Sequence, residues 1–191
     1  NELQHLVILT RDITLRKEYE TKLKYFAYHD ALTELPNRLL FNKRFASAKK
    51  QFLNKNNGLA IIILDIDHFK VINDTYGHDI GDAVIKEFGV RIQQSIRSHD
   101  TVARLGGDEF VILLPNIQSN GNALEIAKRI KNAMQQPWKI KGQKLTVTTS
   151  MGIAMATFSQ KFNKSDLIKK ADIALYEAKN SGRDSYKLYL D

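Results

Sequence analysis

The sequence predicts an α+β fold, an α/β sandwich in which helices flank a mostly antiparallel central sheet. Segments of strand and helix character alternate along the chain, around an apolar hairpin near its middle. That hairpin is RLGGDEF (104–110), where the apolar runs VARL and FVILL enclose two glycines and two acids. The chain has 191 residues, of which 43% are hydrophobic and 26% charged, so it is long enough for one domain with its own core.

The first residues predict a strand followed by an exposed helix. Residues 5–10 (HLVILT) are strand-like, and we interpret them as the last strand of a domain upstream. Residues 15–28 form a charged helix with one narrow apolar stripe, which consists of Leu15, Tyr19, Leu23 and Phe26. The stripe fits a helix that docks on its own domain and equally a dimerising helix, because its spacing is close to a heptad. Since the chain begins with Asn1 rather than Met, we expect a fragment of a longer protein.

The remaining elements follow from Asp30 onward. DALTELPNR is turn-like and opens a helix near Pro36, a residue favoured in a first turn, and this helix ends near Gln51. The apolar run over 59–66 predicts a buried strand, and residues 82–97 predict a helix with one apolar face, formed by Ile85, Phe88, Ile92 and Ile96. After the hairpin we expect a helix over 121–136, a strand over 146–157, a helix over 165–181 and a strand over 186–190.

Composition excludes some functions and favours others. The chain has no cysteine, which excludes disulfides, thiolate zinc sites and cysteine nucleophiles. Its net charge of +8 suits an anionic ligand, whether nucleotide, nucleic acid or membrane surface. We expect no nucleic-acid partner, because no known binding motif and no stripe of basic and aromatic residues is present. No apolar run is long enough to span a bilayer, so we expect a cytoplasmic domain without membrane insertion, in a parent protein that is either soluble or membrane-anchored.

Carboxylates follow apolar or glycine-rich segments at two places. Asp65 and Asp67 end the strand predicted over 59–66, and Asp108 and Glu109 directly follow the two glycines. A soluble turn explains the glycines but not two acids at the start of a strand, whereas capping of a helical turn explains Asp65 or Asp67 as well as ligand binding does. Oxygen ligands without cysteine favour Mg²⁺ or Mn²⁺ over zinc. If the two strands are neighbours, Asp65, Asp108 and Glu109 converge as in two-metal nucleotidyl transfer.

Four motifs, in this order along the chain, resemble those of the GGDEF domain, the family of diguanylate cyclases that make cyclic di-GMP from two GTP molecules. They are DALTELPNR (30–38), DIDHFKVINDTYGHDIGD (65–82), GGDEF (106–110) and ADIALYEAKNSGRD (171–184). The family fold is similar to the palm domain of adenylyl cyclases and polymerases. RDITLRKEYETKL (11–23) resembles the end of a PAS sensor domain and its output helix. The resemblance thus divides the chain into the end of a PAS-like domain with a linker helix (1–28) and a GGDEF catalytic domain (29–191).

The resemblance implies a metal site and a pair of catalytic acids. Asp65, the carbonyl of Ile66 and Asp108 are implied ligands of Mg²⁺, with Mn²⁺ as an alternative. Asp108 and Glu109 are the implied catalytic residues, and Glu109 assists the metals or the deprotonation of the attacking hydroxyl.

The resemblance also implies a set of substrate-binding residues, which are Phe69, Lys70, Asn73, His78, Asp82, Lys179 and Arg183. Backbone amides at Phe69 and Lys70 cradle the phosphates, and Lys179 and Arg183 meet the triphosphate. For these last two residues a basic helix end favoured by the helix dipole is the local alternative.

Guanine recognition is implied for Asn73 and Asp82. A neutral amide and an ionised carboxylate together read guanine, because the carboxylate accepts from N1 and the amino group. His78 lies near the same nucleotide. The local alternatives are that Asp82 is only a helix cap and that His78 is only a loop histidine.

The segment RSHD (97–100) resembles the family's inhibitory site for its product. Arg97 and Asp100 are the implied product-binding residues, and Arg104 is a further donor. A guanidinium pairs with phosphate or a guanine edge, and an aspartate accepts from guanine. The local alternative is a surface pair between Arg97 and Asp100, worth about 0.2–0.5 kcal/mol on a helix.

The activity implied by the resemblance is the condensation of two GTP into cyclic di-GMP and two pyrophosphates. One domain offers one GTP half-site, so the implied partner is a second copy in a two-fold homodimer, brought together by the upstream sensor domain. The alternative is a GTP- or cyclic-di-GMP-binding regulatory module of a larger GGDEF–EAL protein, with an EAL domain downstream. The intact acids argue against a purely regulatory role.

Overall fold

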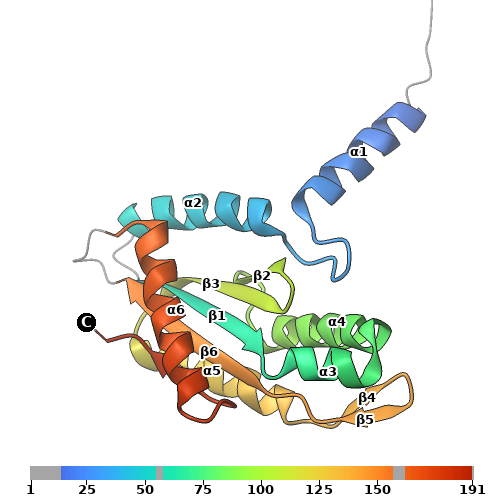
Figure 1. The fold of residues 1–191 in the computed structure, drawn as a ribbon. Coiled ribbons are helices and arrows are strands. Elements are labelled where there is room, and N and C mark those ends of the chain that lie inside the picture. Colours follow the sequence, from blue (N-terminus) through green and yellow to red (C-terminus); the bar gives the residue numbers. More distant parts are fainter. Residues whose placement is uncertain (1–13, 55–57, 157–161, 191) are drawn as a thin grey trace, which may run out of the picture.

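The computed structural model describes residues 14–54, 58–156 and 162–190, so the strand predicted over 5–10 lies outside the described residues. Five strands form one sheet in the order β2-β3-β1-β6-β7 (Figure 1). The central strand β1 (Gly58–Ile66) pairs antiparallel with β3 (Glu109–Ile117) and with β6 (Thr149–Ala156). β2 (Thr101–Gly106) forms an antiparallel hairpin with β3, and β7 (Tyr186–Leu188) lies parallel to β6. The mostly antiparallel sheet that the sequence predicts is confirmed.

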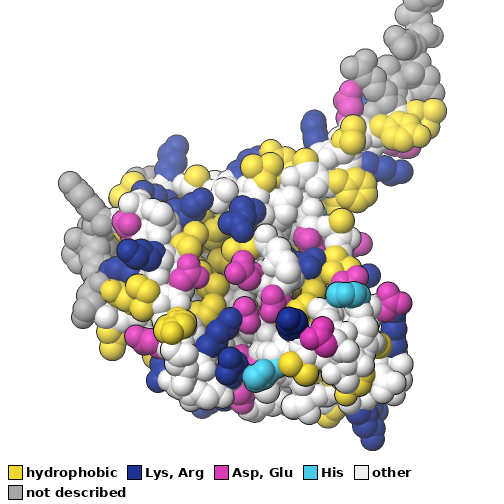
Figure 2. All heavy atoms as spheres, in the orientation of Figure 1, with side chains coloured by type: hydrophobic (Ala, Val, Ile, Leu, Met, Phe, Trp, Pro, Cys, Tyr) yellow, Lys and Arg dark blue, Asp and Glu magenta, His cyan; other side chains and the backbone are white. Residues whose placement is uncertain are grey.

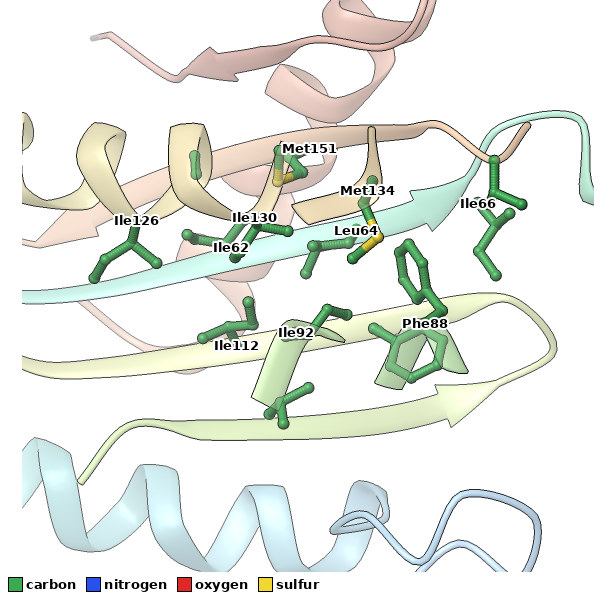
Figure 3. Close-up of a cluster of buried hydrophobic side chains, with 14 of the residues drawn as sticks. Ile62, Leu64, Ile66, Phe88, Ile92, Ile112, Ile126, Ile130, Met134 and Met151 are labelled. Carbon is green, nitrogen blue, oxygen red and sulfur yellow. The ribbon is translucent and has the colours of Figure 1, made fainter. Parts of the chain in front are cut away.

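Helices cover both faces of the sheet because its inner strands are apolar on both sides. Alternate side chains of β1 enter two cores. One core lies under α2 (Arg38–Asn54) and α6 (Lys164–Asn180). The other lies under α3 (Phe69–Tyr76), α4 (His78–Ser95) and α5 (Asn120–Met134). Figure 3 shows this second core, in which Ile62 and Leu64 of the sheet face side chains of α4 and α5.

The first helix, α1 (Thr14–Tyr28), projects away from the body of the domain (Figure 1). Its four stripe residues are between 63% and 69% exposed. The stripe therefore does not dock on the domain that follows. Among the described residues, no helix is both long and apolar enough to cross a bilayer.

Several predicted boundaries are wrong. The helix predicted to open near Pro36 begins at Arg38, because the side chain of Asn37 caps it by accepting from the amides of Leu39 at 2.9 Å and Leu40 at 3.1 Å. The helix predicted over 82–97 begins at His78, after Gly77 with a φ of 84°. The polar segment before it is helix α3 rather than a loop. Asp82 therefore lies inside α4 and is not its cap.

A small hairpin precedes the strand predicted over 146–157. It consists of β4 (Trp138–Ile140) and β5 (Gln143–Leu145), which pair antiparallel. The predicted strand is β6, which begins only at Thr149. The hairpin closes one end of the core, where Trp138 and Ile140 are buried.

Candidate active site

The two strands that carry the predicted acids are neighbours in the sheet. Asp65 at the end of β1 lies opposite Glu109, the first residue of β3. The turn that carries Asp108 relies on Gly106 and Gly107, whose φ values are 143° and 54°. Figure 2 shows this face of the molecule, with acidic side chains gathered near its centre and Lys and Arg side chains around them.

The charge balance at Asp65 suits a bound cation. Its side chain is 18% exposed, and Nζ of Lys179 lies 2.8 Å from its Oδ2. Burial raises the pKa of Asp65, and the charges of Asp108 and Asp67 raise it further, against the opposing effect of Lys179. Two neighbouring carboxylates that repel each other, with a cationic group already at one of them, fit a divalent ion with hard oxygen ligands.

The region includes an acid that the sequence prediction missed. Asp172 lies on α6, and the pKa of its carboxyl is raised by burial and by the charge of Glu109. Asp172 belongs to the motif ADIALYEAKNSGRD, which the prediction used only for its basic residues. Its helical position relative to Lys179, two turns later, was the available signal.

The loop after β1 leads directly into a helix N-terminus. His68 adopts a left-handed conformation with a φ of 57°, and α3 begins at Phe69 and Lys70. The first amides of a helix have no acceptor within the helix, and the dipole favours an anion there. The structure thus places Phe69 and Lys70 where backbone amides can bind phosphate, beside Asp65 and Ile66.

The two predicted guanine-reading residues lie on helices that touch. A Cβ added at Gly81 of α4 would lie 1.8 Å from Oδ1 of Asn73 on α3, so a larger residue there would displace the Asn73 side chain. Asp82 follows Gly81 and is exposed, as is His78 at the start of α4. The close packing of α3 on α4 therefore sets the distance between Asn73 and Asp82.

The C-terminal end of α6 brings a basic residue to the acids. Lys179 lies in the last turn of α6 and Arg183 in the turn that follows. Lys179 contacts Asp65 directly, and its predicted contact with a triphosphate stays a prediction. Arg183 is exposed and adopts a φ of 62°.

The structure joins two of the three predicted product-binding residues. The backbone amide of Arg97 donates to Oδ2 of Asp100 at 2.9 Å, and Asp100 is 8% exposed. Burial raises the pKa of Asp100, against the hydrogen bond from Arg97. These two residues line an open cavity of about 610 Å³ that reaches Tyr25 and His29 at the end of α1. They precede β2, whose far end carries the GGDEF turn.

Arg104, the third residue predicted to bind the product, makes its hydrogen bonds to the start of the domain and to the GGDEF turn. Its Nη1 donates to Oδ1 of Asp30 at 2.9 Å, and its Nε donates to the carbonyl of Gly107 at 2.9 Å. The side chain is 11% exposed. Through Nη1 and Nε, Arg104 thus joins the start of the domain to the GGDEF turn.

The domain is thus an α/β sandwich that carries carboxylates at the ends of two paired central strands, with a helix N-terminus shortly after β1. The family model described as "Diguanylate cyclase, GGDEF domain" matches residues 27–185. The chain belongs to the GGDEF family.

Two curated relatives from Pseudomonas aeruginosa illustrate the relationship. The chain is 37% identical over 165 residues to the bifunctional diguanylate cyclase/cyclic di-GMP phosphodiesterase MucR. The matched region covers 86% of this chain and 24% of MucR. It is 39% identical over 173 residues to the diguanylate cyclase TpbB. The matched region covers 90% of this chain and 40% of TpbB. The chain therefore spans well under half the length of these relatives.

Solved structures share the fold. The GGDEF domain of TpbB from P. aeruginosa superposes with a TM-score of 0.81 at 39% identity, over 85% of this chain and 94% of that one. The coiled coil and GGDEF domain of DgcB from Caulobacter crescentus, in complex with c-di-GMP, superposes with a TM-score of 0.83 at 26% identity, over 92% of this chain and 93% of that one.

Proposed function

We propose that this domain is a diguanylate cyclase, which condenses two GTP into cyclic di-GMP and releases two pyrophosphates. The observation that carries the proposal is the pairing of Asp65 with Glu109 at the end of β1 and β3. The charge of Asp108 acts on Asp65, Lys179 contacts Asp65, and α3 begins three residues after β1. Each of these groups has a task in nucleotidyl transfer, and none is replaced in this chain.

The chain's own residues bind and orient the nucleotide. The amides at Phe69 and Lys70 hold the phosphates, and Lys179 and Arg183 neutralise the triphosphate charge. Asp65, the Ile66 carbonyl and Asp108 would hold Mg²⁺ or Mn²⁺, which supplies charge stabilisation at the reacting phosphate and lowers the pKa of the attacking hydroxyl. Glu109 lies next to Asp108, where it can take up the proton of that hydroxyl or support the metal site.

Residues at the contact between α3 and α4 select the base. Asn73 and Asp82 offer an amide and a carboxylate to the guanine edge, and His78 begins the same helix. A site built from such polar groups rejects adenine, because adenine leaves them without partners.

The assembly follows from the stoichiometry. One domain binds one GTP, and the product is two-fold symmetric, so two copies meet face to face. We place the active dimer in the cytoplasm, where GTP is available, under the control of an upstream sensor domain. Arg97 and Asp100, away from the acids, form the site at which the product inhibits.

A regulatory role is the second candidate. Relatives of this chain include MucR, which is named as bifunctional, and the cyclic di-GMP phosphodiesterase NbdA. In such a protein the domain would bind GTP or cyclic di-GMP and control a downstream EAL domain.

Incubation of the purified protein with GTP and Mg²⁺, followed by chromatography of the products, separates the two candidates. Formation of cyclic di-GMP by the wild type, and none by Asp108→Asn, supports the cyclase. Binding of GTP without product, at concentrations where the protein is dimeric, supports the regulatory module.

A further inference from the structure

The buried carboxylate of Asp67 connects two segments that are distant in sequence. Asp67 directly follows β1 and is 4% exposed. Its Oδ1 accepts from Oγ of Ser150 at 2.6 Å. Its Oδ2 accepts from Oγ1 of Thr148 at 2.8 Å and from the backbone amide of Asp184 at 3.0 Å. Asp67 therefore joins the loop after β1 to the turn after α6.

The turn after α6 needs support from outside. Gly182, Arg183 and Asp184 adopt successive positive φ values of 102°, 62° and 40°. Side-chain-bearing residues rarely adopt this conformation, and it persists only where surrounding contacts determine it. The conformation fixes the direction in which the chain presents Arg183.

Two groups hold this turn from opposite sides. Asp67 accepts the Asp184 amide from the sheet side. Nζ of Lys131, on α5, lies 3.1 Å from Oδ2 of Asp184 and also contacts its backbone carbonyl. Among the described residues, Oδ1 of Asp184 is buried without a hydrogen-bond partner, so the side chain is anchored through Oδ2.

We propose that Asp67 is a positioning residue that acts through Arg183: it fixes the strained turn after α6 so that Arg183 faces the same phosphates as the loop after β1. The proposal rests on the proposed function, because the contact of Arg183 with the triphosphate is part of that function. We assign Asp67 a positioning role because its buried carboxylate already accepts hydrogen bonds from three protein donors.

The chemistry of the three partners predicts which substitutions are tolerated. Hydroxyl groups can turn and accept a hydrogen bond, but the backbone amide of Asp184 can only donate. In Asp67→Asn, the amide oxygen can keep the Asp184 contact while the amide nitrogen donates to Ser150. Asp67→Ala removes the acceptor altogether. We therefore expect Asn to rescue most of what Ala loses.

Equilibrium binding measures the effect without requiring turnover. We expect Asp67→Ala to bind GTP about tenfold or more weakly, as for one misplaced charge-assisted hydrogen bond, while its affinity for GMP, which lacks the outer phosphates, stays within about twofold. Ser150→Ala is the matched control, because it removes a hydrogen bond to the same carboxylate and leaves the Asp184 contact. Ser150→Ala is expected to lower the unfolding temperature without weakening the binding of GTP more than that of GMP.

A double-mutant cycle tests whether Asp67 affects GTP affinity through Arg183. If Asp67 acts through Arg183, Asp67→Ala has no further effect on GTP affinity in an Arg183→Ala background. If Asp67→Ala does not fold, Lys131→Met withdraws the other support of the turn and is expected to show the same selective loss for GTP. Equal losses for GTP and GMP, or additive effects in the cycle, would overturn the proposal. GTP binding with this pattern but no cyclic di-GMP would uphold it while the cyclase activity fails, and a wild type that binds no GTP would overturn both.

Discussion

The ion pair between Asp30 and Arg104 should be a measurable source of stability. The two side chains are 23% and 11% exposed, and their closest atoms are 2.9 Å apart. Oδ1 of Asp30 also accepts from the amide and the hydroxyl of Thr33, at 2.9 Å and 2.7 Å. Asp30→Asn keeps an oxygen for Thr33 but removes the charge that faces Arg104.

The expected loss lies between the values for surface and buried pairs. Exposed pairs contribute about 0–1 kcal/mol, whereas removing one partner of a buried pair costs about 3–5 kcal/mol. Because both side chains are mostly covered and Arg104 keeps its bond to Gly107, we expect Asp30→Asn to lower the free energy of unfolding by about 1.5–2.5 kcal/mol. Asp30→Ala, which also loses both Thr33 bonds, should cost about 1 kcal/mol more.

The pH dependence gives the sign of the effect. Burial disfavours the Asp30 carboxylate, but hydrogen bonds from Thr33 and Arg104 outweigh it, so the pKa of Asp30 lies below its ordinary value of 3.8. A group with a depressed folded-state pKa stabilises the fold above its unfolded pKa and loses this effect as the pH falls through the folded pKa. The difference between wild type and Asp30→Asn should therefore be full at neutral pH and shrink below pH 3.8.

Urea unfolding can be followed through Trp138, the only tryptophan of the chain, which is 2% exposed. Glu125→Gln, at an exposed carboxylate of α5, is the control and should change stability by no more than about 0.5 kcal/mol. A loss for Asp30→Asn no larger than that of the control, or one that persists unchanged in acid, would refute the reasoning.

Four further predictions concern the proposed activity. Asp108→Asn should abolish cyclic di-GMP formation with the fold intact, because an amide is a poor ligand for a hard cation, and near-normal turnover would remove Asp108 from the mechanism. Asp82→Ala should weaken the binding of GTP and reduce the preference of the domain for GTP over ATP by at least about tenfold in competition assays. An unchanged preference would place guanine recognition elsewhere. Specific activity should rise with protein concentration, whereas constant activity in demonstrably monomeric protein would contradict a shared site. Arg97→Ala should leave the initial rate almost unchanged and relieve non-competitive inhibition by added cyclic di-GMP, and equal sensitivity of both proteins would leave RSHD without that role.

Sequence patterns predicted the strands and the hairpin because both depend on local signals, whereas the approach of the acids was predicted only on the condition that β1 and β3 are neighbours. The run over 59–66 is apolar at nearly every position, which marks a strand buried on both faces, and the Gly-Gly turn fixes the hairpin. The helix over 69–76 was missed because His68 and Gly77, which bound it, provide no side-chain cap. The hairpin at 138–145 was missed because each of its strands has only three residues, too few to show alternation.

The contacts between residues distant in sequence could not be predicted, for a different reason. Arg104 lies on the strand between RSHD and the GGDEF turn, and nothing in its neighbourhood shows that its partner is Asp30, 74 residues earlier. Asp67 and Asp65 are likewise indistinguishable in the motif DID, although one points into a set of donors and the other toward the acids of the hairpin. Only the pairing of distant segments separates these roles.

The degree to which each carboxylate is satisfied provides a physical criterion for those roles. Asp67 and Asp30 are surrounded by donors from the protein, so adding a ligand there would break existing hydrogen bonds. Asp65 is in the opposite state: burial and the charge of Asp108 raise its pKa, and it forms an ion pair with Lys179. Removing Lys179 from Asp65 without a replacement would leave two half-buried carboxylates repelling each other, which is unfavourable. In the proposed activity, a divalent cation bound with the triphosphate would resolve this conflict, because Asp65 and Asp108 would bind the metal and Lys179 would pair with the phosphates. The hydrogen bonds and ion pairs of each carboxylate thus separate the acids that stabilise the fold, Asp67 and Asp30, from Asp65, which we propose binds the ligand.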